Sequence, residues 1–306
     1  MNQTAQSGVA TDGNRLLGPE ETPPFRVERA DARGPFLLVC EHAGRVVPRR
    51  LGTLGLAPHH FERHIAYDLG ALELARALAA RLDAPLVWQP YSRLVCDCNR
   101  RPEAASFISE LSEDTPIPGN RGLSPEERRR RIEEVFRPFH DRVRELLERQ
   151  LSAREGRLVF VTVHSFTPVF LGERREMEVG LLFNRHPQVA RRVGPLLEAR
   201  GVRLAYNAPY AMSDEEDFTV PFHAERRGLP SLEIEVRQDL LARQGDIERW
   251  AGVLAEALAA AVPAVLASAP HPHGRDIRQA RSADGAAGPS PSPPADSASG
   301  RRGARS

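Results

Sequence analysis

Hydrophobic residues fall into two kinds of block along the chain, and the two kinds alternate. Apolar segments of strand length, which predict strands, cover residues 36–40, 84–88, 94–96, 158–163, 178–183, 202–205 and 231–236. In the last segment Leu232, Ile234 and Val236 alternate with Glu233 and Glu235. Apolar residues at helical spacing, which predict amphipathic helices, cover residues 64–82, 124–151, 189–200 and 246–262. This alternation of strand and helix predicts an α/β fold.

The helix predicted over residues 124–151 has a clear start. Ser124-Pro125-Glu126-Glu127 is a capping box with proline at the first helical position. Pro138 predicts a kink, because proline lacks the N–H that the helix interior needs. The arginines of residues 128–131 are expected on the solvated face, since Glu133 and Glu134 lie beside them.

The two ends of the chain differ in composition from its middle. Residues 1–33 mix glycine, proline and charge without periodicity, so we expect a flexible N-terminal arm, with Phe25 and Val27 against the domain. Residues 34–265 should form a single domain. Residues 268–306 are rich in Ala, Pro, Ser and Gly, and we expect a disordered tail because they cannot bury enough apolar surface to offset chain entropy.

Composition limits the kinds of partner. With 42 basic and 41 acidic residues the net charge is +1, so no overall field would attract nucleic acid or an anionic membrane. Cys40, Cys96 and Cys98 are odd in number and lack paired Cys-x-x-Cys spacing, which argues against a disulfide framework. Residues 1–14 are polar, unlike a secretory signal, and no uninterrupted apolar run is long enough for a membrane span. We therefore expect a soluble, cytoplasmic protein.

The predicted strand ends share one property: each carries side chains that can bind a metal or move a proton. They are Glu41 and His42 after 36–40, Arg93 to Arg100 around 94–96, His164 after 158–163, and Glu233 and Glu235 within 231–236. In open α/β sheets, ligands bind beyond the carboxyl ends of the strands. Two histidines and a carboxylate are a common catalytic zinc set, and a further carboxylate can take the proton of a water molecule.

Short motifs at these places resemble those of a known family. The motifs are Glu41-His42-Ala43-Gly44, Asp68-Leu69-Gly70, Ser92-Arg93 with Asp97-Cys98-Asn99-Arg100, His164-Ser165-Phe166-Thr167-Pro168, and Glu235-Val236-Arg237-Gln238-Asp239. From about residue 35 to 262 the chain resembles the N-formylglutamate amidohydrolase family, which is distantly similar to zinc carboxypeptidases and aspartoacylases. The resemblance implies a three-layer α/β/α fold with a mixed, mostly parallel sheet.

The resemblance also implies roles for single residues. His42 and His164 match the metal-binding histidines, Asn99 and Arg100 the pair that holds the substrate's carboxylate, and Glu235 the general base, while Arg93 would stabilise the oxyanion. The carboxypeptidase relatives carry a metal-binding Glu three residues after the first histidine, where this chain has Arg45. Asp68 or, as second choice, Glu41 is expected to replace it. His223 is a further candidate for substrate contact.

The implied reaction is metal-dependent hydrolysis of a small-molecule N-acyl amino acid, such as N-formyl-L-glutamate to formate and L-glutamate. Zinc would lower the pKa of water toward about 7, and Glu235 would remove its proton. The same ligand types accept cobalt, manganese or iron, so the sequence leaves the metal open.

Other functions are compatible with the same residues. A peptide or a longer N-acyl amino acid would be the substrate if the irregular segments 103–120 and 207–223 form a larger pocket. A non-catalytic ligand-binding protein is the third hypothesis, because the carboxylate expected at position 45 is missing. The remaining histidines are expected at the surface: His59, His60, His140, His186, His271 and His273. The oligomeric state does not follow from the sequence.

Overall fold

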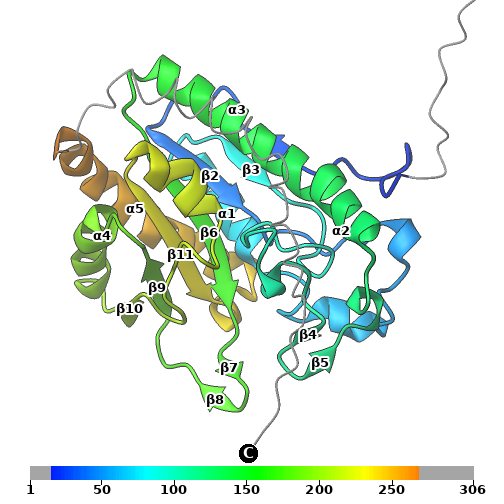
Figure 1. Ribbon diagram of the computed structural model, residues 1–306. Helices are drawn as coiled ribbons and strands as arrows, with labels where there is room; N and C mark the ends of the chain where they lie inside the picture. The colour runs from blue at the N-terminus through cyan, green and yellow to red at the C-terminus, as the bar shows by residue number, and fades with distance from the viewer. Residues whose placement is uncertain (1–14, 269–306) are drawn as a thin grey trace, which may run out of the picture. The chain divides into compact units, whose positions relative to one another are not determined.

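A mixed sheet of seven strands forms the centre of the structure, a computed structural model that describes residues 15–268 (Figure 1). Across the sheet the strands are β1 (Arg26–Glu28), β3 (Leu86–Trp88), β2 (Phe36–Cys40), β6 (Val159–Phe166), β11 (Ser231–Arg237), β9 (Val179–Leu182) and β10 (Leu204–Tyr206). Strands β3, β2, β6 and β11 are parallel neighbours, as are β9 and β10. The β1–β3 and β11–β9 pairs are antiparallel. The predicted mixed, mostly parallel sheet is confirmed.

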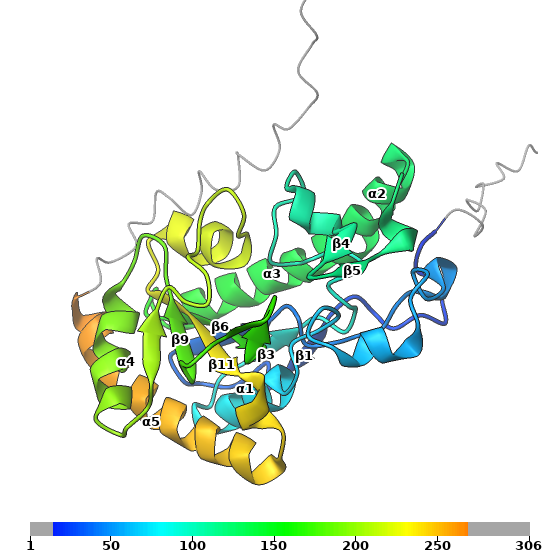
Figure 2. The same ribbon diagram turned by 90° about the horizontal axis from the view of Figure 1, so that it is seen from below.

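Helices cover both faces of this sheet (Figure 2). One face packs against α1 (Ala71–Arg81), α4 (Gln188–Glu198) and α5 (Gln244–Ser268). The other packs against α3 (Arg137–Ala153), which continues from α2 (Pro125–Arg131) through a π-helical turn, η6 (Ile132–Phe136). Neighbouring residues of β2 show the two layers, since Leu38 packs on the α1 side and Leu37 on the α3 side. The three-layer α/β/α arrangement is thus present.

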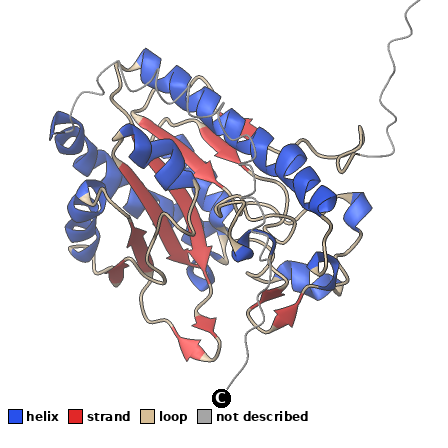
Figure 3. Cartoon of the chain, in the orientation of Figure 1, coloured by secondary structure: helices blue, strands red, loops and turns tan. Residues whose placement is uncertain are grey.

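Shorter elements connect these layers (Figure 3). Two small hairpins are β4 (Leu111–Ser112) with β5 (Thr115–Pro116), and β7 (Val169–Phe170) with β8 (Glu173–Arg174). A second π-helical turn is η7 (Val220–Ala224). Short 3₁₀ helices are η2 (Arg49–Leu51), η3 (Pro58–Glu62), η4 (Ala105–Ile108), η5 (Pro118–Asn120), η8 (Glu225–Arg227) and η9 (Gln238–Leu241).

Strand β6 is longer than the sequence predicts. It does not stop at His164 but continues to Phe166, because β11 pairs with it in parallel as far as Phe166 opposite Arg237. Every residue of β6 and β11 is buried. His164 therefore lies inside a central strand of the sheet.

Residues 94–96, predicted as a strand, form a turn instead. Arg131 explains part of this difference, because its guanidinium donates to the backbone oxygen of Val95 and to Asn120 Oδ1. Only 1% of the Arg131 side chain is exposed, so its predicted place on the solvated helix face is wrong. The capping box at Ser124 and Glu127 is confirmed, and the π-helical turn η6 lies just before Pro138.

The described part of the N-terminal segment is packed against the domain. The backbone N–H groups of Leu16 and Leu17 donate to the Glu134 carboxylate, and both leucines are buried. Strand β1 lies within residues 1–33, so the sheet begins inside the segment predicted as a flexible arm. The predicted tail, residues 268–306, lies outside the described residues from 269 onward, as do residues 1–14.

Helix α5 is long and apolar enough, by length and composition alone, to cross a membrane. Its buried residues, among them Trp250, Leu254 and Leu258, belong to the hydrophobic cluster shared with α1 and the sheet. Helices in the core of soluble proteins pass the same test of length and hydropathy.

Candidate active site

Two imidazole rings meet beyond the carboxyl end of β2. His42 follows this strand and His164 lies in its parallel neighbour β6, with Val39 opposite Thr162 in the register. Their Nδ1 atoms lie 3.2 Å apart, and both rings are buried. The sequence prediction that these histidines come together is consistent with this geometry.

Asp68 completes the group from the segment just before α1. Its Oδ2 lies 2.9 Å from His164 Nδ1 and 3.4 Å from His42 Nδ1. Its backbone N–H donates to the backbone oxygen of His42, which holds the two segments together. Gly70 turns the chain into α1 with a φ of 77°, and a Cβ there would lie 2.5 Å from the Cβ of Leu241.

Carboxylates face the outer nitrogens of both rings. Asp97 Oδ1 lies 2.7 Å from His42 Nε2, and Glu41 Oε2 lies 3.2 Å from His164 Nε2. Asp97 accepts a hydrogen bond from His42 Nε2, so that nitrogen carries a proton and His42 Nδ1 presents a lone pair. His42 Nδ1, His164 Nδ1 and the Asp68 carboxylate face one another, an arrangement that a cation stabilises.

The charges around the rings favour a cation at the same point. Burial alone would lower the pKa of His164, but the carboxylates of Glu233 and Glu41 outweigh burial and raise it. Burial would raise the pKa of Asp68, yet His42 and His164 lower it. The site therefore favours a positive charge beside an ionised carboxylate.

The three inner atoms fit a divalent metal ion. Atoms bound to zinc at about 2.0–2.1 Å in a tetrahedral arrangement lie about 3.3 Å from one another. The distances among His42 Nδ1, His164 Nδ1 and Asp68 Oδ2 are 3.2, 2.9 and 3.4 Å, close to one face of such a tetrahedron. Asp68, the first choice from the sequence, lies close to both Nδ1 atoms, whereas Glu41 lies beside Nε2 on the far side of the His164 ring.

Glu235 stands beside this group on the next strand. The β6–β11 register places it directly opposite His164. Burial, together with the charges of Asp68 and Glu233, raises the pKa of Glu235 to about 8. A pKa near neutrality suits a group that accepts and returns a proton.

Arg93 lies on the other side of the group. Its Nη2 donates to Asp97 Oδ2 at 2.5 Å, and its Nη1 donates to Asp68 Oδ1 at 3.5 Å. The Arg93 guanidinium therefore brings a positive charge to the edge of the site.

A cavity of 410 Å³ opens onto these side chains. His42, Asp68, Arg93 and Glu235 line one part of it. The rest is lined by loop and hairpin residues, among them Arg100, Ser112, Phe166, Phe170, Arg175 and Tyr210. The two small hairpins contribute Ser112 and Phe170, so segments 103–120 and 207–223 do shape the pocket together with β7.

Two residues predicted to touch the substrate do not line this cavity. Asn99 is buried, donates to Glu233 Oε2 and accepts the backbone N–H of Thr219. His223 is fully buried, and its Nε2 lies 3.0 Å from His140 Nδ1. His140 is itself buried, so its predicted surface position is wrong: Phe139 of α3 packs on its ring, and Phe222 of η7 packs on the His223 ring.

Arg100 does line the cavity, where it pairs with Asp217 at 2.5 Å. Sequence reasoning missed Tyr210 and Arg175, because no periodicity in the surrounding irregular segments indicates where these side chains point. It also gave Asp97 no role in the site, although Asp97 accepts from Arg93, from the N–H of Asn99 and from His42.

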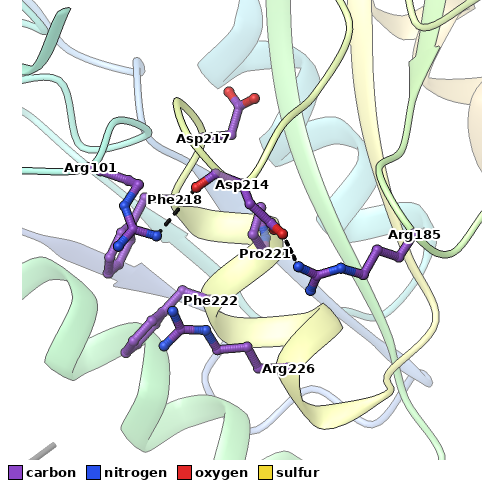
Figure 4. A pocket seen from close by; sticks show the side chains of 8 residues that line it. All are labelled: Arg101, Arg185, Asp214, Asp217, Phe218, Pro221, Phe222 and Arg226. Atoms are coloured by element: carbon purple, nitrogen blue, oxygen red, sulfur yellow. Dashed lines mark hydrogen bonds and ion pairs between the residues drawn. The ribbon is translucent and has the colours of Figure 1, made fainter. Parts of the chain in front are cut away.

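A smaller hollow of 110 Å³ is lined by Asp217 (Figure 4). Arg101 and Arg185 both bond to Asp214 there, and Arg226 lies over the Phe222 ring. Asp217 pairs with Arg100, which lines the larger cavity. His42, His164 and Asp68 do not line the hollow, so the candidate chemistry belongs to the larger cavity.

Comparison with known proteins identifies the family of the chain. The family model of N-formylglutamate amidohydrolase matches residues 34–242. The chain belongs to the N-formylglutamate amidohydrolase family. It is therefore an amidohydrolase, a hydrolase that acts on amides of a small-molecule substrate.

Solved structures share the fold of this family member. The gene product Atu2144 from Agrobacterium tumefaciens is 40% identical, with a TM-score of 0.79 over 82% of this chain and 99% of that one. The N-formylglutamate amidohydrolase from Ralstonia eutropha JMP134 is 22% identical, with a TM-score of 0.57 over 81% of this chain and 98% of that one, a likeness of fold alone. No curated protein sequence matches the chain.

Proposed function

We propose that this protein is a metal-dependent amidohydrolase that cleaves the N-acyl amide of an N-acyl amino acid such as N-formyl-L-glutamate, giving formate and L-glutamate. The observation that carries the proposal is the meeting of His42 Nδ1, His164 Nδ1 and the Asp68 carboxylate beside Glu235. A zinc ion suits two imidazoles and a carboxylate, although other divalent ions accept the same donors. The small cavity favours a small-molecule substrate, and the free cysteines Cys40, Cys96 and Cys98 favour the reducing cytoplasm.

The metal ion, held by His42, His164 and Asp68, would activate water and polarise the substrate's carbonyl. Glu235 takes the proton of the attacking water and passes it to the leaving amine. Its burial and its pKa near neutrality make both transfers accessible. Arg93 stabilises the negative charge that develops on the carbonyl oxygen.

The carboxylate of the substrate's amino acid is held by Arg100. This guanidinium lines the cavity and pairs with Asp217 through Nη1, which leaves other N–H groups for a substrate carboxylate. Burial and the charge of Glu233 raise the pKa of Asp217 to about 6, although the charge of Arg100 lowers it. Asp217 is therefore mostly ionised near pH 7 and holds Arg100 in place.

Reconstitution with metal tests the proposal. The purified protein is treated with chelator, reloaded with zinc, cobalt or manganese, and assayed for release of formate, acetate and succinate from the matching N-acyl-L-glutamates. We expect bound metal near one equivalent, activity that requires it, and loss of both in His164→Ala. His186→Ala, a half-buried histidine outside the cavity, serves as the control. A metal-loaded protein that hydrolyses no N-acyl amino acid would contradict the proposal.

A further inference from the structure

Arg175 brings a third guanidinium into the cavity wall. It follows hairpin β7–β8, and its guanidinium carbon lies 4.8 Å from the Phe170 ring centre and 5.8 Å from that of Phe166. Its Nη1 donates to the backbone oxygen of Thr167 at 3.4 Å. Packing against two rings fixes the plane of the guanidinium and leaves its N–H edge for another partner.

The three arginines of the cavity differ in their counter-charges. Arg93 pairs with Asp97 and Asp68, and Arg100 pairs with Asp217. Among the residues that the structure describes, no acidic side chain lies within 4.0 Å of the Arg175 guanidinium, and Glu235 and Glu113 act on it only from farther away. A half-buried guanidinium without a contacting counter-charge is costly, and a bound anion would reduce that cost.

Hairpin β7–β8 is itself held in place. The backbone N–H of Leu171 donates to Glu113 Oε1, while Glu113 Oε2 accepts from Arg63. Glu113 lies between β4 and β5, so the two hairpins are joined across the cavity wall. The position of Arg175 is therefore set by the fold before any substrate binds.

We infer, building on the proposed function, that Arg175 is a specificity-determining residue that binds a second carboxylate, the one on the side chain of an acidic N-acyl amino acid. Arg100 then holds the main-chain carboxylate, and the scissile amide lies toward Glu235. A guanidinium binds a carboxylate through two parallel hydrogen bonds, whereas the neutral amide of a glutamine side chain offers only one acceptor. The cavity of 410 Å³ leaves room for a dicarboxylate of this size.

Replacement of Arg175 by methionine tests this assignment. Methionine keeps the length and the packing on both rings but removes the charge. We expect the preference for N-formyl-L-glutamate over N-formyl-L-glutamine, measured as the ratio of kcat/KM values, to fall by about 30-fold in Arg175→Met, as expected for a charged hydrogen-bonded pair. The change should appear in KM, and Arg175→Lys should restore part of the preference.

The control is Arg174→Met. Arg174 is the neighbouring residue, its side chain is 77% exposed, and it pairs with Glu176 outside the cavity. This variant should keep the preference of the unmodified protein. Equal losses on both substrates in Arg175→Met would instead indicate a structural role for the guanidinium, and an unmodified protein with no preference for glutamate would overturn the inference.

A binding measurement tests this inference independently of the proposed function. Calorimetry on zinc-loaded Glu235→Gln protein, with and without Arg175→Met, compares N-formyl-L-glutamate with N-formyl-L-glutamine when no turnover occurs. Selective binding of the glutamate compound that depends on Arg175 supports the inference even if the unmodified protein hydrolyses neither compound. Equal binding of both compounds overturns it even if both are hydrolysed.

Discussion

Asp97 and His42 meet on the side of the imidazole that faces away from the metal-binding atoms, with Oδ1 2.7 Å from Nε2. The backbone N–H of Asn99 donates to the same oxygen, and Arg93 donates to the other. Burial would raise the pKa of Asp97, but the charges of Arg93 and His42 hold it well below its usual range. An ionised Asp97 keeps the His42 proton on Nε2 and leaves Nδ1 free to bind metal.

Asp97→Asn should therefore weaken metal binding without removing a ligand. We expect zinc affinity, measured by competition with a fluorescent chelator, to fall by about 10- to 100-fold, because an amide holds the ring in the correct protonation state less strongly. Asp239→Asn removes a carboxylate that pairs with Arg237 beyond β11 and should leave zinc affinity unchanged. Equal affinities in the two variants would show that Asp97 does not act through His42.

Glu235→Gln should separate metal binding from catalysis. Removal of the proton-transferring carboxyl is expected to lower kcat by at least about 100-fold, while zinc content stays near that of the unmodified protein. The matched control is Glu178→Gln, since Glu178 accepts the backbone N–H of Arg203 outside the cavity. A kcat within about threefold of the control would exclude Glu235 as the general base.

Much of the fold was predictable because the buried strands β2 and β6 are mostly apolar runs, and β11 alternates apolar residues with Glu233 and Glu235. Strands β2, β6 and β11 are buried at every position, and their cores were predicted within a few residues. Residues 94–96 show the limit of this reasoning. Their apolar side chains pack in the core as a strand's would, but a buried arginine from α2 takes the Val95 carbonyl, a long-range contact that no local pattern indicates.

The candidate site, like the fold, could be predicted from the sequence only in part. His42, His164 and Glu235 could be found because each lies on or just after a predicted strand. The direction in which a side chain points could not be predicted from the sequence. His223 points toward His140 in a buried pair rather than into the cavity. Arg175 was missed because its role depends on how hairpin β7–β8 folds against Phe166, which the sequence does not reveal.

The His140–His223 pair should make the protein sensitive to acid. His140 Nε2 donates to the backbone oxygen of Cys98, Nδ1 accepts from His223, and burial lowers the pKa of His140 to about 4. An unfolded histidine has a pKa of about 6.5, so the unfolded state binds more protons between these values and stability falls as the pH is lowered through them. His140 alone should lower the free energy of unfolding by about 2 kcal/mol at pH 5 relative to pH 7.5.

Urea unfolding of chelator-treated protein at pH 7.5 and pH 5.0 measures this loss. Glutamine at position 140 keeps a donor for the backbone oxygen of Cys98 but does not titrate. Between the two pH values the free energy of unfolding should therefore fall by about 2 kcal/mol less in His140→Gln than in the unmodified protein. His59→Gln, at an exposed position, should retain the full loss. The same pH dependence in His140→Gln would rule out this histidine as its source.

Arg131 links the stability of the fold to the site. Besides Val95 and Asn120, it donates to the backbone oxygen of Gly119, and burial lowers its pKa. Arg131→Met would leave these buried acceptors unpaired, so we expect the free energy of unfolding to fall by about 2–4 kcal/mol in urea titrations.

Arg129→Met on the same helix is the matched control. Arg129 pairs with Glu126 and Glu133 on the exposed face, and its loss should change the free energy of unfolding by less than about 0.5 kcal/mol. Because Val95 lies between Arg93 and Asp97 in the chain, Arg131→Met should also lower zinc affinity, whereas Arg129→Met should not. If Arg131→Met loses stability but binds zinc as tightly as the control, the turn at residues 94–96 holds Asp97 in place without help from the helix.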